Sequence, residues 1–103
     1  MLPSRGASLA NYCDRYIYMT GGKFEKYNSW HRRSNDVLES EVVKKVHIFD
    51  IENKSVTMAP EMQKSRYFHG SAILGNRLYV YAGFDGESIQ QTMEVLTLIA
   101  SIF

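Results

Sequence analysis

The chain has 103 residues, which is enough for one small domain or for part of a larger one. Hydrophobic residues make up 45% and charged residues 22%, the balance of an ordered globular protein, which argues against a disordered chain. Twelve Lys and Arg residues against eleven Asp and Glu residues leave a net charge of +1. This even balance excludes a protein that holds nucleic acid or a membrane surface by bulk charge.

Three features of the sequence predict a cytoplasmic protein. Cys13 is the single cysteine, so no internal disulfide can form and a reducing compartment is the simpler expectation. The first residues lack the apolar core of a secretory signal. The longest apolar run, residues 96–103, is far shorter than the roughly 20 residues of a membrane-spanning helix, so we expect no membrane contact.

The first part of the chain predicts one strand and one long insertion. Residues 3–11 read as a polar lead-in, and the β-favouring run 16–20 predicts a short strand that ends at two consecutive glycines. Residues 23–41 are polar and show no helical period. We therefore predict an inserted loop there, with one helical turn at residues 36–40.

The middle of the chain predicts two further strands. In residues 42–50 neither set of alternating side chains is fully polar, as expected of a strand that is partly covered on both faces. Residues 52–54 form a turn, and a short outer strand at 55–58 ends at Pro60, since proline cannot donate a ladder hydrogen bond.

The last part of the chain predicts a hairpin and a final strand. Residues 70–74 and 77–81 are strand-like and are separated by a Gly-Asn pair, which is a strong hairpin signal. A polar loop at 84–91 leads to a strand at 92–98. Short strands at close spacing with turn signals between them predict an all-β protein.

The sequence also repeats itself. Residues 61 positions apart match along the first strands: Arg5 with Arg66, Ile17 with Leu78, Tyr18 with Tyr79 and Gly22 with Gly83. Beyond the glycines the separation falls to 47, as for Val46 and Met93, because the insertion adds 14 residues to the first unit. A unit of about 47 residues is the size of a four-stranded propeller blade.

The repeated unit resembles the Kelch repeat. The likeness lies in an arginine ahead of the first strand, a strand ending in two glycines, a strand ending in an aromatic and Asp, and a Pro-x-Met: Arg66-x-x-His69, Tyr16-Ile17-Tyr18-Met19-Thr20-Gly21-Gly22, Phe49-Asp50 and Pro60-Glu61-Met62. Three positions depart from the Kelch pattern. Val56 replaces its Trp, Ala82 its first glycine and Thr97 its Asp.

This resemblance implies two Kelch-type four-stranded antiparallel propeller blades, at residues 1–58 and 59–103. The second blade lacks its fourth strand. A closed propeller needs four to eight blades, so two imply a fragment of a larger propeller, a truncated product, or a chain that associates with itself through exposed strand edges. The alternative is a single β-meander or small barrel whose self-similarity is accidental.

In such blades the long connections emerge at one end of the sheets and the short turns at the other. The long ones are residues 23–41, 60–66 and 84–91. Because loops on a rigid scaffold carry binding functions, we expect the contact surface at the long-loop end. Blades of this kind resemble the substrate-recognition part of ubiquitin-ligase adaptors and of cytoskeletal scaffolds.

The candidate residues of a protein-binding surface are aromatic and charged side chains in these loops. Aromatic and Arg side chains are enriched at interface hot spots, and an Arg pair suits an acidic peptide. The alternative is a solvated loop whose Trp folds back onto the blade. Binding of single-stranded nucleic acid is disfavoured because acidic residues follow at once. The candidates are Lys26, Tyr27, Trp30, Arg32, Arg33, Arg66, Phe84 and Asp85; for Arg66 a structural role is the stronger expectation.

The rival class is a fragment of a Kelch-propeller enzyme of the oxidase or sugar isomerase type. His31, His47 and His69 lack the spacing of a metal site, and the single Cys13 adds no second thiolate. The ligand set of a copper site is not discernible. We therefore expect no catalytic residues, no metal and no cofactor, and a nonfunctional truncated propeller remains the third possibility.

Overall fold

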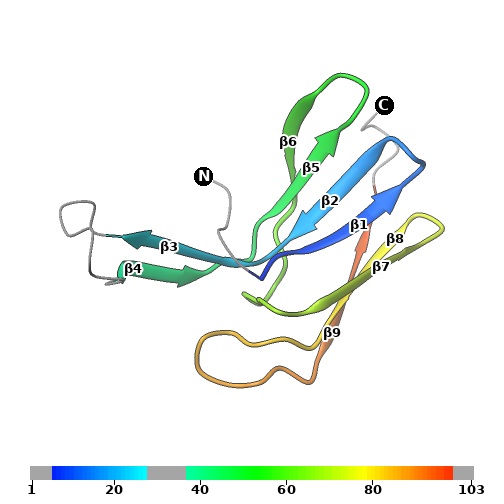
Figure 1. The fold of residues 1–103 in the computed structure, drawn as a ribbon. Coiled ribbons are helices and arrows are strands. Elements are labelled where there is room, and N and C mark those ends of the chain that lie inside the picture. The colour runs from blue at the N-terminus through cyan, green and yellow to red at the C-terminus, as the bar shows by residue number, and fades with distance from the viewer. Residues whose placement is uncertain (1–5, 28–36, 99–103) are drawn as a thin grey trace.

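The computed structural model describes residues 6–27 and 37–98, and within these ranges the chain forms nine β-strands (Figure 1). The strands are β1 (Ser8–Tyr12), β2 (Tyr16–Thr20), β3 (Lys23–Tyr27), β4 (Val37–Val42), β5 (Val46–Asp50), β6 (Ser55–Ala59), β7 (Gly70–Leu74), β8 (Arg77–Tyr81) and β9 (Met93–Thr97). No helix occurs in the described residues, so the all-β prediction is confirmed.

Two antiparallel sheets form the body of the molecule. The first blade has the strand order β1-β2-β5-β6, and the second has the order β7-β8-β9. The predicted hairpin is confirmed, since Leu74 pairs with Arg77 across the Gly75-Asn76 turn. Gly75 adopts φ +62°, a conformation that glycine reaches without strain. As predicted, the described part of the second blade has three strands rather than four.

The repeat found in the sequence is a repeat of strand pairing. Tyr18 lies opposite Ile48 in the first blade, and Tyr79 lies opposite Val95 in the second. These pairs are related by the same separations of 61 and 47 residues. The innermost strands β1 and β7 are instead related by 62 residues, because the turn after β1 has three residues and the turn after β7 has two.

The long insertion corrects one prediction. Within the predicted loop at 23–41, residues 23–27 and 37–41 are strands rather than a loop with a helical turn, because β3 and β4 pair antiparallel as a two-stranded sheet that projects away from both blades (Figure 1). The other residues of the predicted loop, 28–36, lie outside the described residues. The pairing register places Lys26 opposite Glu39. A search for helical or strand period along one chain segment does not detect such a pairing.

Two strand bounds also differ from the prediction. The supposed lead-in at 3–11 contains most of β1, whose Ala10 is buried between the blades. The strand predicted at 42–50 is two elements, because Val42 ends β4 and β5 begins at Val46. At residues 3–11 a polar stretch hid a strand that is fixed by its neighbours, and at residues 42–50 one continuous strand pattern hid the break between β4 and β5.

The hydrophobic core lies between the two blades. The first blade contributes Tyr16, Tyr18, Val46 and Ile48, and the second contributes Leu78, Val80 and Leu98. At the innermost strands the hydroxyls of Ser8 and Ser71 are 2.5 Å apart. Small side chains at this position let β1 and β7 approach closely, as expected of strands near a propeller axis.

Candidate functional site

The three long connections emerge at one end of the blades, and the short turns emerge at the other (Figure 1). Backbone hydrogen bonds join the roots of the long connections. Val43 N donates to Gly22 O (2.8 Å), Gly22 N donates to Arg66 O (2.7 Å), and Tyr67 N donates to Phe84 O (2.9 Å). These hydrogen bonds connect the backbone of both blades at the long-loop end into one network, which we call the backbone base.

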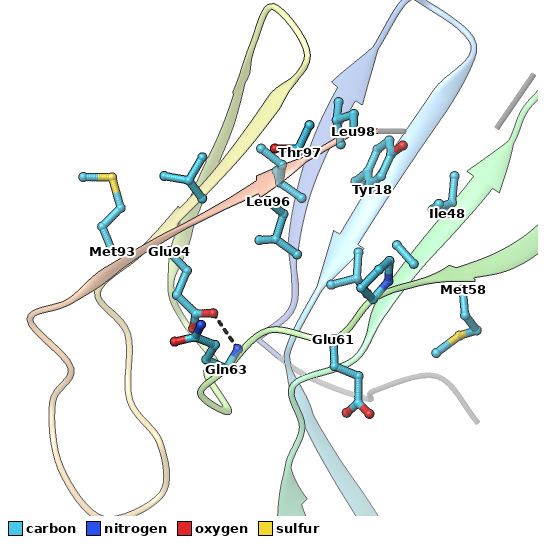
Figure 2. A pocket seen from close by; sticks show the side chains of 15 residues that line it. Tyr18, Ile48, Met58, Glu61, Gln63, Met93, Glu94, Leu96, Thr97 and Leu98 are labelled. Carbon is cyan, nitrogen blue, oxygen red and sulfur yellow. Dashed lines mark hydrogen bonds between the residues drawn. The ribbon is translucent and has the colours of Figure 1, made fainter. Parts of the chain in front are cut away.

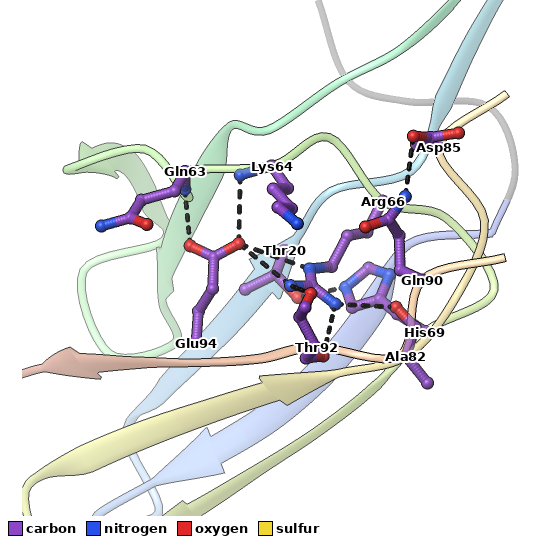
Figure 3. Close-up of polar contacts among 10 residues, drawn as sticks. All are labelled: Thr20, Gln63, Lys64, Arg66, His69, Ala82, Asp85, Gln90, Thr92 and Glu94. Carbon is purple, nitrogen blue, oxygen red and sulfur yellow. Dashed lines mark hydrogen bonds and ion pairs between the residues drawn. The ribbon is translucent and has the colours of Figure 1, made fainter. Parts of the chain in front are cut away.

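Arg66 is the centre of this base (Figure 3). Its side chain is fully buried, and its guanidinium donates to the carbonyl oxygens of Ala82 (2.9 Å) and Thr92 (2.8 Å) and pairs with the Glu94 carboxylate at 3.3 Å. The same carboxylate accepts hydrogen bonds from the backbone N–H groups of Gln63 (2.5 Å) and Lys64 (3.0 Å). Of the two roles predicted for Arg66, the structure shows the structural one.

Next to Arg66, a buried histidine links the blades. His69 Nε2 lies 2.8 Å from Thr20 Oγ1, and its Nδ1 has no hydrogen-bond partner in the part of the chain that the structure describes. Burial, and secondly the positive charge of Arg66, lower the pKa of His69 to about 4. The ring is therefore neutral at pH 7 and is a buried, hydrogen-bonded residue of the inner strands.

Three aromatic side chains gather beside this base. The Tyr67 ring lies 4.8 Å from the Phe68 ring and 5.6 Å from the Phe84 ring, centroid to centroid. Lys23 Nζ lies 5.5 Å from the centroid of the Tyr67 ring, within the range of a cation–π interaction. We call Tyr67, Phe68 and Phe84 the aromatic cluster.

Phe68 stands out within the aromatic cluster. Its side chain is 68% exposed although it is large and apolar, and its backbone has φ +54°. A positive φ in a bulky residue is strained, and the surrounding structure must hold it. The hydrogen bond from Phe68 N to Gly6 O (2.8 Å) is one such restraint. The structure thus fixes an exposed ring at the long-loop end.

The 84–91 loop is ordered by its own side chains. Asp85 accepts hydrogen bonds from the backbone N–H groups of Glu87 and Ser88, both at 2.8 Å, and from the Gln90 amide at 2.7 Å. The hydrogen bonds from Ser88 and Glu87 lower the pKa of Asp85. Ile89, which pairs with Phe84 across this loop, is 76% exposed.

The predicted site residues are distributed unevenly. Lys26 and Tyr27 belong to β3 of the projecting hairpin, and Trp30, Arg32 and Arg33 lie outside the described residues. Phe84 is half-buried in the aromatic cluster, and Asp85 accepts hydrogen bonds within its own loop. The sequence analysis missed two exposed residues at the same end, Phe68 and Ile89. Ile89 has one sequence signal, an apolar side chain between polar neighbours in the predicted connection 84–91, whereas Phe68 lies just beyond the predicted connection 60–66.

A groove of about 620 Å³ separates the outer parts of the two blades. Figure 2 shows Tyr18 and Ile48 of the first blade facing Leu96 and Leu98 of the second. The Tyr18 hydroxyl has no hydrogen-bond partner among the described residues, and burial raises its pKa to about 12. The groove lies on the inter-blade core and away from the aromatic cluster.

The sequence pattern of the Kelch motif matches residues 65–99. A solved structure of YjhT, a Kelch-type propeller protein, is similar to this chain with a TM-score of 0.70 and 15% sequence identity. The similarity covers 92% of this chain and 28% of that one, so this chain spans less than a third of that protein's length. No curated protein matches the sequence.

These comparisons confirm the fold prediction. The four-stranded sheet and the three-stranded sheet have the fold of propeller blades like those of YjhT, and neither sheet is closed into a ring. In the described part of the chain, no group of three or more His, Cys, Asp or Glu side chains is placed to hold a metal ion. The same residues contain no helix of the length and hydrophobicity needed to cross a membrane. The blade boundary between residues 58 and 59 stays a prediction.

Proposed function

We propose that this chain is a non-catalytic protein-binding module that acts as part of a larger Kelch-type propeller and contacts its partner through the long-loop end. The observation that carries the proposal is Phe68, an exposed ring held at a positive φ over the Arg66 base. Rigid aromatic side chains are favoured as interface anchors because little conformational entropy is lost when they bind.

The chemistry of the surface defines the partner. Phe68 and Ile89 offer two exposed apolar anchors, and the connections at the same end of the blades also carry exposed charges of both signs, on Lys64, Glu61 and Glu87. A protein or peptide that inserts an apolar side chain between these anchors fits this arrangement. The acidic character expected of the partner rests on Arg32 and Arg33, outside the described residues, and remains part of the proposal.

A peptide library tests the binding surface. A random-sequence peptide display library is selected on the immobilised full chain, and the dissociation constants of the enriched peptides are measured by fluorescence polarisation. Phe68→Ser and Ile89→Ser are each expected to weaken binding by about 10-fold or more. Ile51→Ser, an equally apolar exposed position at the short-turn end, is the matched control and should leave the dissociation constant unchanged. Peptides that lose affinity only with Ile51→Ser would contradict the proposal.

Two further parts of the proposal have direct tests. For a non-catalytic module, metal analysis of the purified chain is expected to find no stoichiometric copper, and one copper ion per chain would favour the oxidase class instead. The cytoplasmic location is proposed from the exposed free thiol of Cys13. Fluorescence microscopy of the tagged protein in its own cells tests that location, and a secreted or organellar signal would contradict it.

A further inference from the structure

Residues at equivalent positions of the two blades differ in burial. Val46 is fully buried, whereas its equivalent Met93 is 60% exposed. Ile48 is 4% exposed, whereas its equivalent Val95 is 52% exposed. The backbone registers are the same, so the difference comes from what each sheet face packs against.

Each sheet has two faces, which we name by their central residues. The tyrosine face carries Tyr18 in the first blade and Tyr79 in the second, and the aliphatic face carries Ile17 in the first and Leu78 in the second. Side chains that are directly opposite each other across a strand pair lie on the same face, so the pairing register assigns every strand residue to one of these faces.

Within the chain, the tyrosine face of the first blade packs against the aliphatic face of the second. The buried core shows this, since it joins Tyr18 and Ile48 to Leu78 and Val80. The Ser8–Ser71 contact joins the same two faces at the innermost strands. Among the residues that the structure describes, no other sheet packs on the remaining two faces, the aliphatic face of the first blade and the tyrosine face of the second, which we call the unpaired faces.

Both unpaired faces carry exposed apolar side chains. Of the ten large hydrophobic side chains that are exposed in the described residues, seven lie on these two faces. Exposed apolar side chains on a sheet face are typical of an interaction site. The aliphatic face of the first blade carries Leu9, Val56 and Met58, and the tyrosine face of the second carries Leu74, Tyr81, Met93 and Val95.

The total surface supports the same conclusion. The chain has 7063 Å² of accessible surface, whereas a compact monomer of 11.9 kDa exposes about 6,000 Å². The projecting β3–β4 hairpin accounts for part of the excess. The excess is also comparable with the roughly 800 Å² that each partner buries in a standard protein interface.

We propose that the chain assembles head to tail with further copies of itself, the tyrosine face of one second blade packing on the aliphatic face of the next copy's first blade. The occupant is a second copy because the same kind of face pair already packs inside each chain, so the new interface continues an existing one. A head-to-tail interface is heterologous and closes into a ring when its rotation permits. Two, three or four copies give the four, six or eight blades of known propellers. The proposal uses sheet faces and does not depend on what the long loops bind.

The mass of the full chain in solution is the first test. Sedimentation equilibrium, or light scattering after size-exclusion chromatography, is expected to give two, three or four times 11.9 kDa. A folded species that stays at 11.9 kDa up to its solubility limit would overturn the proposal. So would a mass that grows without limit, because that indicates an open aggregate.

Complementary double variants test the head-to-tail geometry. Leu74→Glu/Val95→Glu charges only the tyrosine face, and Leu9→Glu/Val56→Glu charges only the aliphatic face. All four side chains are more than half exposed, so the blades should still fold, which circular dichroism checks. Each double variant alone is expected to be a monomer, because every junction needs one intact face of each kind.

Mixing the two double variants gives the decisive result. One variant retains an intact aliphatic face and the other an intact tyrosine face, so an equimolar mixture is expected to form a dimer with one copy of each. A mixture that stays monomeric, or a single variant that still forms homodimers through like faces, would overturn the proposal. Ile51→Glu/Ile89→Glu adds the same charge at exposed apolar positions off both faces and should keep the wild-type mass.

Discussion

The backbone hydrogen bonds of the two blades are more similar to each other than their side chains are. Ile51 N donates to Arg15 O in the first blade, and Leu98 N donates to Asn76 O at the equivalent place in the second. At the other end of the sheets, Gly21 N donates to Lys45 O and Ala82 N donates to Thr92 O. These equivalent bonds recur although the residues differ, so the repeat consists of backbone geometry into which each blade fits different side chains.

The buried or paired arginine that stabilises each blade lies at the short-turn end of the first blade and at the long-loop end of the second. In the first blade, Arg15 at the short-turn end donates to the Asp50 carboxylate at 3.0 and 3.1 Å, and Asn76 and Thr97 stand at the equivalent positions of the second blade. The second blade instead receives the buried Arg66 at the long-loop end. The Arg66 backbone bonds to the first blade while its side chain enters the second, so this residue joins the two.

Removing the Arg66 guanidinium tests this joining role and should have the largest effect. Arg66→Met leaves the Glu94 carboxylate buried without its cation and is expected to lower the free energy of unfolding by about 3–5 kcal/mol. Urea unfolding at fixed protein concentration measures the change. Arg66→Met/Glu94→Gln removes the unpaired charge as well and should recover part of the loss. A loss below about 1 kcal/mol for Arg66→Met would show that the blades are joined by their apolar faces alone.

Substitution of the residue that follows the second strand of each blade tests how closely the blades approach each other there. Gly21 and Ala82 occupy equivalent positions with nearly identical φ angles of +60° and +61°. A Cβ on Gly21 would collide with the Arg66 carbonyl oxygen and crowd the His69 ring. Gly21→Ala is therefore expected to cost about 2–4 kcal/mol, from left-handed strain together with overpacking. Urea unfolding checks this value, and a neutral substitution would contradict the close approach of the two blades.

The sequence predicted the parts of the fold that local chemistry determines. The strand Tyr16–Thr20 ends at two glycines, and the hairpin around Gly75 has both a turn pair and alternating strands, so their bounds came out as predicted. The β3–β4 hairpin depends on the pairing of two segments that are ten residues apart, and neither segment shows a strand period by itself. Pairing across a gap is not visible in a one-segment pattern.

The candidate site was less predictable for a similar reason. Phe68 reads in the sequence as one of several aromatic residues beside Arg66 and His69. Its exposure follows from a positive φ, which depends on contacts with residues as distant as Gly6. Arg66 was recognised by its resemblance to a Kelch arginine. Its burial depends on Glu94 and Thr92, which lie 28 and 26 residues away.

The His69–Thr20 contact gives a test that depends on pH. Unfolded histidine titrates near pH 6.5, whereas His69 in the folded chain titrates near pH 4. Between these values the unfolded state binds more protons, so acid favours unfolding. The contribution of neutral His69 to the free energy of unfolding is complete above pH 6.5 and is lost as the pH falls toward 4. The melting temperature at pH 4.5 should therefore drop below its value at pH 7 by a few degrees more in wild type than in the variant His69→Gln.

The remaining titrating groups set the control for this test. Burial also lowers the pKa of His47 on the outer face of the first blade, so part of the acid sensitivity persists in His69→Gln. The difference between wild type and variant isolates His69. If the melting temperatures of wild type and His69→Gln changed by the same amount between pH 7 and pH 4.5, His69 would be as solvated in the folded chain as in the unfolded one.

The smallest effect is expected from Ala82→Gly, which makes the second blade match the first. Ala82 holds a left-handed conformation with an exposed side chain, and relief of this strain outweighs the extra entropy that glycine brings to the unfolded chain. The free energy of unfolding is expected to rise by up to about 1 kcal/mol, measured by urea unfolding beside Gly21→Ala. The two substitutions thus have opposite signs at equivalent positions, because only Gly21 faces the Arg66 carbonyl oxygen. If both destabilise the chain, the strain at Ala82 is relieved by contacts of its methyl group, and the blades differ there in packing as well as in sequence.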